Sequence, residues 1–144
     1  MRLDMDCIRD LLLCIEDNTG LRKACFFIDH GLSDTAHYTG EETEPFAYQL
    51  PLDDKYENDK LIYHLNYCVD AELVTLSNAS TLYRIMVSDL TPTGHQFLNN
   101  IRDEGIWEKV KSISSSFSSV SLQMISNTAA QVLSAIIKHK LNLN

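Results

Sequence analysis

The sequence has no long apolar run, which argues against a membrane-spanning helix. A membrane-spanning helix needs about 20 consecutive, mostly apolar residues, and no part of the 144-residue chain provides them. Residues 1–18 are partly apolar, but acidic side chains interrupt them and leave no apolar core for a secretory signal peptide. These side chains are Asp4, Asp6, Asp10, Glu16 and Asp17. We therefore expect a cytoplasmic protein that does not bind membranes.

Cysteine pairs of the C-x-x-C type are also absent, which argues against a zinc site among the 4 cysteines. Cys7 and Cys14 would lie about 10 Å apart along a helix, too far for a disulfide bond. His64 and Cys68 have the i, i+4 spacing of two helical metal ligands, although a partly buried cysteine beside a surface histidine is the more ordinary explanation. We expect free thiols, no bound metal and no cofactor.

Catalytic motifs are missing as well. The sequence contains no GxSxG turn, no phosphate-binding loop, no HExxH helix and no glycine-rich dinucleotide turn. Asp29 and His30 follow an apolar run, where a strand-end active site could lie, but the adjacent Gly31 favours an ordinary turn. We therefore expect a protein that is not an enzyme.

Basic residues are scarce, and the acidic residues are concentrated in one segment. The chain has 12 Lys and Arg against 20 Asp and Glu, for a net charge of -8. Residues 29–59, which we call the acidic segment, contain 9 of these acids and one base, Lys55. DNA binding needs Lys and Arg at the phosphates, and only Lys60 and Arg84 are placed to contact them. The acidic segment suits a basic partner, although acidic surface loops are common in soluble proteins.

The spacing of apolar residues predicts an α+β fold. Helical spacing predicts helices over residues 4–18, 56–72, 92–103 and 119–141. Short apolar or alternating runs predict strands at residues 24–28 and 46–50 and a β-hairpin over residues 73–90. The core is expected to include Ile8, Leu12, Leu61, Leu65, Ile85, Phe97 and Leu98.

The stretch LTPTGHQFL, residues 90–98, marks the start of a helix. Thr91 suits the N-cap, and Pro92 suits the first helical position. Helix, strand, helix, hairpin and helix follow one another as in a winged helix-turn-helix, and the segment around the hairpin resembles PadR-like and MarR-like regulators. Those regulators often have a glycine before the first wing strand, where this chain has Glu72. The resemblance implies a winged helix-turn-helix-like core, followed here by a C-terminal amphipathic helix.

Three longer stretches extend the comparison along nearly the whole chain: LDMDCIRDLLLCIED, YHLNYCVDAELV and LTPTGHQFLNNIRDEGIWEKVK. Together with the apolar C-terminal helix, they resemble the family catalogued as domain of unknown function 2513. The most specific agreement is at Gly94, His95, Phe97, Leu98, Ile101, Arg102, Asp103, Trp107, Val110 and Lys111. Members of this family are small proteins common in phages and prophages of bacteria. The resemblance implies a mobile-element setting in a bacterial host and supplies no catalytic residues.

The C-terminal helix is expected to pair two copies of the chain. We place a winged-helix-like domain at residues 1–111, with the acidic segment as a loop, and a polar linker with the C-terminal helix at residues 112–144. The wide apolar stripe of that helix could be covered by the first helix of the same chain or by a second copy, and we favour a homodimer. The expected interface residues are Leu122, Ile125, Val132, Leu133, Ile136 and Ile137.

Two functions fit these observations. The favoured one is a non-catalytic phage or prophage accessory protein that binds a basic host or phage protein through its acidic surface. Two tyrosines at i, i+4 spacing beside the acids support this, because tyrosine is enriched at interfaces. The alternative is a winged-helix transcriptional regulator that binds DNA as a dimer. The expected partner-binding residues are Asp53, Asp54, Glu57, Asp59, Tyr63 and Tyr67.

Overall fold

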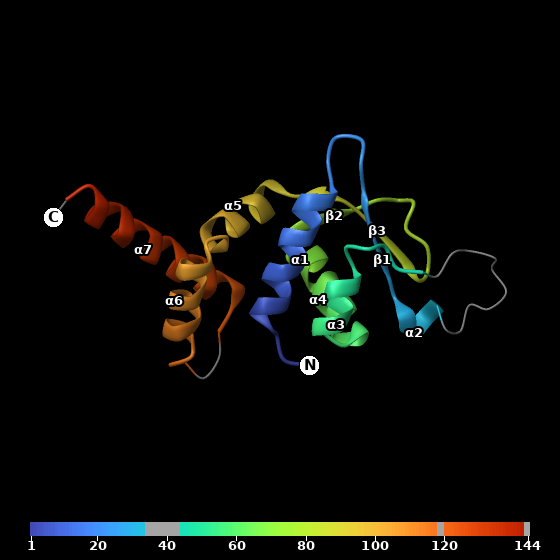
Figure 1. The fold of residues 1–144 in the computed structure, drawn as a ribbon, viewed down its shortest axis with the longest axis horizontal. Helices are drawn as coiled ribbons and strands as arrows, with labels where there is room; N and C mark the ends of the chain where they lie inside the picture. The colour runs from blue at the N-terminus through green and yellow to red at the C-terminus, as the bar shows by residue number, and fades with distance from the viewer. Residues whose placement is uncertain (34–43, 118–119, 143–144) are drawn as a thin grey trace. The chain divides into compact units, whose positions relative to one another are not determined.

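The computed structural model describes residues 1–33, 44–117 and 120–142 (Figure 1). Within these ranges, helices accompany a small antiparallel sheet, so the α+β prediction is confirmed. The chain divides into two compact units, Met1–His95 and Gln96–Asn144. The elements of the first unit are α1 (Met5–Asn18), β1 (Cys25–Ile28), α2 (His30–Ser33), α3 (Leu50–Lys55), α4 (Asn58–Asp70), β2 (Val74–Leu76) and β3 (Arg84–Leu90). α5 (Pro92–Ile101) begins in the first unit and ends in the second, which also contains α6 (Glu104–Ser114) and α7 (Leu122–Lys140).

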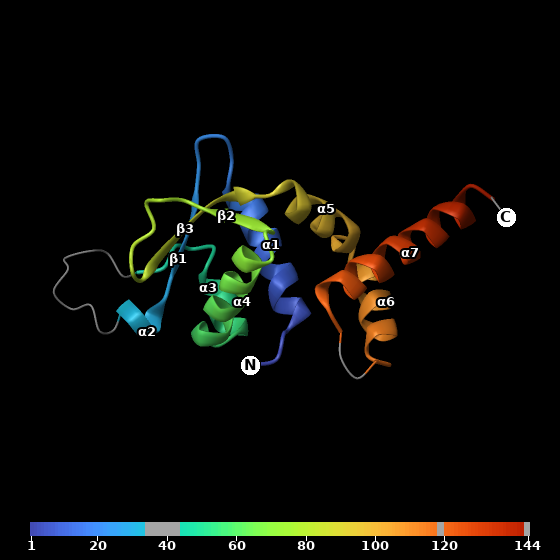
Figure 2. The same ribbon diagram turned by 180° about the vertical axis from the view of Figure 1, so that it is seen from behind.

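The core of the first unit is built around α1 and α4, which lie side by side (Figures 1 and 2). Asp4 is the N-cap of α1, and its carboxylate accepts a hydrogen bond from the backbone N–H of Cys7 at 3.2 Å. α1 also packs against β3, so its apolar stripe is removed from water on two sides. Fully buried side chains of these elements are Ile8, Leu11, Leu12, Ile15, Leu61, Leu65 and Val87.

The three strands form one antiparallel sheet in the order β1-β3-β2. β2 and β3 are the arms of the predicted hairpin, which is confirmed. Val74 and Thr75 pair with Leu90 and Asp89, but Leu76 pairs with Val87, so β3 has one extra residue, Ser88, at a bulge. A bulge of this kind bends the strand and increases its local twist.

Ile85 corrects one of the core predictions, because its side chain is only half-buried. It pairs with Phe27 of β1, near the hairpin end of β3, where the first three residues of the strand are all half-buried. The sheet is therefore less covered at this end than at Val87, which is fully buried. The other predicted core residues are buried: Ile8, Leu12, Leu61, Leu65, Phe97 and Leu98.

The strand predicted at residues 46–50 is wrong. This segment is a turn that leads into α3, where Pro51 stands in the first helical turn. Its side chains nevertheless cover the open edge of β1. The Tyr48 hydroxyl accepts a hydrogen bond from the N–H of Phe26, and the buried Gln49 amide bonds the N–H of Ile28 at 2.8 Å and its C=O at 2.9 Å. Two side chains thus take the place of a further strand.

The end of α4 is closed by backbone hydrogen bonds around Glu72. The N–H of Glu72 donates to the C=O of Val69 at 3.0 Å, and the N–H of Leu73 donates to the C=O of Cys68 at 2.8 Å. This pair of bonds is a Schellman motif, which requires a left-handed residue just after the helix. Glu72 is that residue, with φ of 59°. The position therefore has a backbone conformation that favours glycine.

Thr91 ties the start of α5 to the end of α4. Its hydroxyl accepts a hydrogen bond from the N–H of Gly94 at 2.9 Å, as predicted for an N-cap, and donates one to the C=O of Glu72. Its backbone N–H donates to the C=O of Leu73 at 3.0 Å. The hydrogen bonds of Thr91 in the stretch LTPTGHQFL therefore position the start of α5 beside the end of α4.

The second unit is organised by α6 and α7, which pack against each other. Asp103 caps α6 by accepting a hydrogen bond from the N–H of Ile106 at 2.9 Å, and Ser121 caps α7 in the same way. Residues 118 and 119 of the predicted linker lie outside the described residues. Buried side chains of α6 and α7 include Trp107, Val110, Ile125 and Ala129.

Candidate protein-binding face

Three carboxylates of the acidic segment are exposed where α3 and α4 pack together. Asp54 lies in α3, Glu57 is the N-cap residue of α4, and Asp59 lies in the first turn of α4. Negative charge at this end of α4 is favoured by the helix dipole. We call the surface formed by Asp54, Glu57, Asp59 and Tyr63 the acidic face.

The acidic segment is more regular than the predicted loop. Its described part contains α2, α3 and the start of α4, while residues 34–43 lie outside the described residues. Leu52 of α3 and Tyr56, the C-cap residue of this helix, are both buried and anchor α3 beside α4. This packing explains why a helix forms here. The acids of the face are therefore carried by packed helices.

Asp53, one of the predicted partner-binding residues, is turned into a hydrogen-bonded network. Its carboxylate lies 2.8 Å from Nε2 of His30 and accepts bonds from the side-chain amides of Gln49 and Asn58, each at 3.2 Å. Asn58 also accepts a bond from the backbone N–H of His30 at 2.9 Å. Asp53 of α3 thus joins α2 to α4, whereas Asp54, Glu57 and Asp59 face solvent.

Sequence reasoning missed this network. The sequence does not indicate Gln49 or Asn58, because neither residue belongs to a motif and each bonds Ile28, which is far away along the chain. The sequence predicts an ordinary turn at Asp29 and His30, whereas the structure has His30 at the start of α2. The sequence signal that could have indicated the network is the presence of short polar residues beside the predicted helices. The side chains of such residues often form hydrogen bonds with nearby backbone groups.

The single base of the acidic segment does not neutralise the acidic face. Lys55 Nζ donates to Asp10 of α1 at 2.7 Å, and the hydroxyl of Tyr56 donates to the same carboxylate oxygen at 2.7 Å. The hydrogen bond that Lys55 donates to Asp10 raises the pKa of Lys55 above its ordinary value. Burial and the bond to Asp10 raise the pKa of Tyr56. Lys55 is therefore held by a carboxylate outside the segment.

The exposed side of α4 continues the acidic face along the helix. Asp59, Tyr63, Asn66 and Asp70 follow one another at helical spacing, and all four are exposed. Tyr63 is 43% exposed, whereas Tyr67 is half-buried at the border of this surface. An exposed tyrosine among carboxylates suits a protein partner, because its ring adds apolar contact area and its hydroxyl adds a hydrogen bond.

Both bases expected to contact DNA already have partners in the first unit. Lys60 Nζ lies 2.6 Å from a carboxylate oxygen of Asp4. The guanidinium of Arg84 stacks on Phe26 at 4.4 Å from the ring centre and lies 5.8 Å from the ring centre of Phe46. Lys60 would have to leave Asp4 before it could bind a phosphate.

His64 and Cys68 are not arranged as metal ligands. His64 is fully buried rather than a surface residue, so that expectation is wrong. Its Nε2 accepts a hydrogen bond from the N–H of Asp4 at 2.8 Å, and its Nδ1 lies 2.7 Å from the C=O of Lys60. The Nε2 bond thus fastens the start of α1 to α4, whereas the Nδ1 contact lies within α4. In the described ranges, no group of three potential ligands could hold a metal ion.

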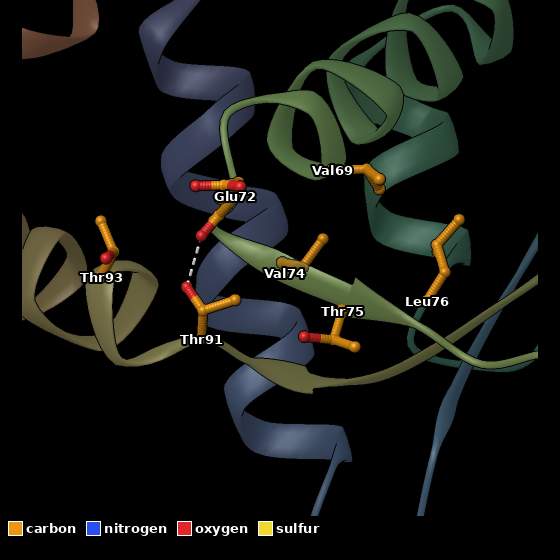
Figure 3. Close-up of a pocket in the computed structure, with 7 residues that line it drawn as sticks. All are labelled: Val69, Glu72, Val74, Thr75, Leu76, Thr91 and Thr93. Carbon is orange, nitrogen blue, oxygen red and sulfur yellow. Dashed lines mark hydrogen bonds between the residues drawn. The ribbon is translucent and has the colours of Figure 1, made fainter.

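A shallow groove of about 450 Å³ lies beside the outer strand β2 (Figure 3). It runs from the end of α4 to the start of α5 and is lined by Val69, Glu72, Val74, Thr75, Leu76, Thr91 and Thr93. Its only charged lining residue is Glu72, whose C=O is bonded by Thr91. The groove holds no arrangement of acid, base and nucleophile.

The predicted dimer residues of α7 differ in their exposure. Ile125 is buried, and the stripe residues nearer the C-terminus are open to water to different degrees. Leu122, Val132, Leu133 and Ile136 are half-buried, and Ile137 is 47% exposed. α6 therefore covers only part of the stripe, which fits its length of 11 residues against 19 for α7.

Fold and surface together define a small α+β protein with an acidic helical face. A family model described as "Hypothetical protein (DUF2513)" matches residues 2–121, and the chain belongs to this family. The resemblance to domain of unknown function 2513 that the sequence indicated is thereby confirmed. No curated protein and no solved structure matches the chain. Among the helices of the described residues, none is long and apolar enough to cross a membrane.

Proposed function

We propose that this protein is a non-catalytic accessory protein of a phage or prophage that binds a basic protein of the host or phage in the bacterial cytoplasm. The observation that carries the proposal is the acidic face, where Asp54, Glu57 and Asp59 are exposed and Lys55 is held away by Asp10. Clustered charge of one sign raises the encounter rate with an oppositely charged partner.

A winged-helix-like core is the finer fold that we propose. The order of α1, β1, α3, α4, β2 and β3 supports it, as does the strand order β1-β3-β2. In this arrangement α4 has the place of the recognition helix and the hairpin that of the wing. The acidic, base-poor side of α4 favours a protein partner over the phosphate backbone.

Partner capture tests the proposal. Tagged full-length protein should retain a basic protein from a bacterial lysate at low salt and lose it as salt rises, because exposed charges are screened. Reversal of the face by Asp54→Lys, Glu57→Lys and Asp59→Lys should abolish this capture. Capture that survives the reversal at low salt would contradict the proposal.

A control variant makes the same change in net charge at three exposed acids that lie outside the acidic face. Asp17→Lys, Glu104→Lys and Glu108→Lys alter three exposed acids in α1 and α6. The face triple removes two acids at the start of α4, Glu57 and Asp59, and the control triple removes one at the start of α6, Glu104, so circular dichroism must show that both variants are folded. The control triple should capture the same protein as the unaltered chain.

DNA binding remains the second candidate, because the element order is that of DNA-binding winged helices. A regulator of this kind should shift DNA in a gel at low salt, with a steep loss of affinity as salt rises. Arg84→Ala should then weaken the shift. The favoured proposal predicts no shift for the unaltered protein at physiological salt.

A further inference from the structure

The two outer strands of the sheet differ in how their free edges are covered. Side chains cover the edge of β1, because Tyr48 and Gln49 bond the backbone of Phe26 and Ile28. β2 is the outer strand on the opposite side, and within the described sheet it pairs with β3 alone. An uncovered strand edge is a template on which another extended chain can pair, and proteins ordinarily block such edges.

The backbone groups on the outer edge of β2 can be identified from the bonds that β2 makes to β3. The C=O of Leu73 accepts a hydrogen bond from the N–H of Thr91 at 3.0 Å, and the N–H of Ser77 donates to a C=O of β3 at 2.8 Å. Alternate residues of a strand turn their backbone groups to opposite edges, so Val74 and Leu76 turn theirs away from β3. None of the described residues bonds these outward N–H and C=O groups.

The groove beside β2 offers side-chain contacts next to this edge (Figure 3). All three residues of β2 line the groove, together with Val69 of α4 and Thr93 of α5. Side chains alternate along a strand, so Val74 and Leu76 lie on one face of β2 and Thr75 on the other. Leu76 is exposed and Val69 is half-buried, so both have apolar surface left for a further strand to contact.

The charge around the groove is negative. Glu72 is the only charged residue that lines it, and Asp70, at the end of the exposed acidic side of α4, is exposed two positions before it. Negative charge of this kind attracts a basic segment and repels a second copy of this chain, whose net charge is -8. The charge therefore favours a basic partner at this edge over self-association.

We propose that an extended basic segment of the partner protein pairs with the outer edge of β2 as a fourth strand. The backbone groups of Val74 and Leu76 bond its backbone, Val69 and Leu76 contact its apolar side chains, and Glu72 pairs with a Lys or Arg. Main-chain bonds supply affinity in this mode, and alternate side chains supply specificity. The inference rests on the proposed function, because it names the part of the same basic partner that binds beyond the acidic face.

Amide hydrogen exchange of the full chain, followed by NMR, tests the inference with a defined probe. The probe is a peptide of alternating lysine and valine at about 1 mM, a concentration that detects even weak binding. It should slow exchange of the Val74 and Leu76 amides about 10-fold, because each N–H then donates to the peptide. A peptide with the same lysines and proline in place of valine should not protect them, since proline has no N–H. Unchanged exchange at both amides, or equal protection by the two peptides, would overturn the inference.

A proline variant removes one backbone donor from the outer edge. Leu76→Pro deletes an outward N–H and leaves the bonds of Leu73 and Ser77 to β3 in place. It should weaken binding of the lysine–valine peptide about 10-fold by fluorescence anisotropy, relative to Leu76→Thr, which also loses the leucine side chain but keeps the N–H. Circular dichroism establishes that both variants are folded, and the exchange experiment on the unaltered chain decides by itself if Leu76→Pro is not. Equal binding by the two folded variants would contradict backbone pairing.

Failure of this inference can be told apart from failure of the proposed function. Capture of the basic partner that is lost on reversal of Asp54, Glu57 and Asp59 but unchanged in folded Leu76→Pro would overturn pairing at β2 and leave the acidic face as the binding site. Capture that survives the reversal but is lost in Leu76→Pro and not in Leu76→Thr would overturn the acidic face and support the β2 edge. Loss in both is the expected result.

Discussion

The backbone carbonyl of Leu73 occupies the space in which a side chain at position 94 would have to lie. A Cβ added to Gly94 would be 2.0 Å from the Leu73 oxygen, well inside the 3.0 Å that real Cβ atoms respect. The carbonyl cannot simply move away, because it accepts the hydrogen bond from the N–H of Thr91. Glycine in LTPTGHQFL is therefore needed for the close approach of α5 to the end of α4.

Gly94→Ala should lower the free energy of unfolding by about 3 kcal/mol or more, since backbone must shift to admit the methyl group. Urea denaturation of the full chain measures the change. Gly20→Ala is the control, because no atom lies within 4 Å of a Cβ at that position. A loss no larger for Gly94→Ala than for Gly20→Ala would show that the close approach is not a constraint.

Glu72→Gly should stabilise the protein by about 1 kcal/mol. Glu72 has φ of 59°, a left-handed conformation that costs a residue with a Cβ about 1 kcal/mol relative to glycine. Glu72→Ala serves as the control, since it removes the carboxylate and keeps the Cβ. Thermal unfolding should show a higher midpoint for the glycine variant only. A midpoint raised equally by both would assign the effect to charge instead.

Much of the fold was predictable because local patterns and tertiary packing agree. The stripe of α1 and the Thr91 cap follow from short-range chemistry, and both are as predicted. The segment around Tyr48 was not predictable, because its alternating apolar residues are equally compatible with an edge strand. What decides its structure is Gln49, whose side chain pairs with Ile28, a partner 21 residues away.

The candidate site was predictable only as a charge pattern. Composition identified the acidic segment, and three of the acids predicted to bind a partner, Asp54, Glu57 and Asp59, are exposed. The sequence does not indicate that Asp53 is turned toward His30 or that Lys55 pairs with Asp10. Both contacts join residues more than 20 positions apart, so no local periodicity reports them.

Asp4 should make stability depend on pH in the acid range. Burial raises its pKa, but the hydrogen bond and charge of Lys60 and the N–H of Cys7 outweigh this and lower the pKa below 3.8. A lowered folded-state pKa means that the carboxylate stabilises the fold above about pH 4 and that this stabilisation is lost as pH falls through the folded-state pKa.

Asp4→Asn keeps a good N-cap but removes the attraction to Lys60, so it should cost about 0.5–1 kcal/mol at pH 7. The difference between the two proteins should shrink as pH falls toward 3, as measured by urea denaturation at several pH values. Lys60→Met should reproduce the same dependence. A difference that stays constant from pH 7 to pH 3 would refute this account.

We propose that the uncovered part of α7 pairs two copies of the chain. The double variant Ile136→Asp and Ile137→Asp places two charges in the apolar stripe and should be a monomer by light scattering. The measurement uses a protein concentration on the order of tens of micromolar, which exceeds the dissociation constants of common interfaces. Gln131→Asp with Ser134→Asp, on exposed polar positions of α7, should leave a dimer. A monomeric unaltered protein at that concentration would exclude the dimer.

The association rate constant of the captured partner tests the central claim most directly. For the unaltered chain and the Asp17, Glu104 and Glu108 reversal, this rate should fall steeply between about 20 and 200 mM salt, because screening weakens long-range attraction. The Asp54, Glu57 and Asp59 reversal should associate about 10-fold more slowly or worse at low salt and lose most of the salt dependence. Equal rates for the two reversals at low salt would show that the acidic face is not where the partner binds.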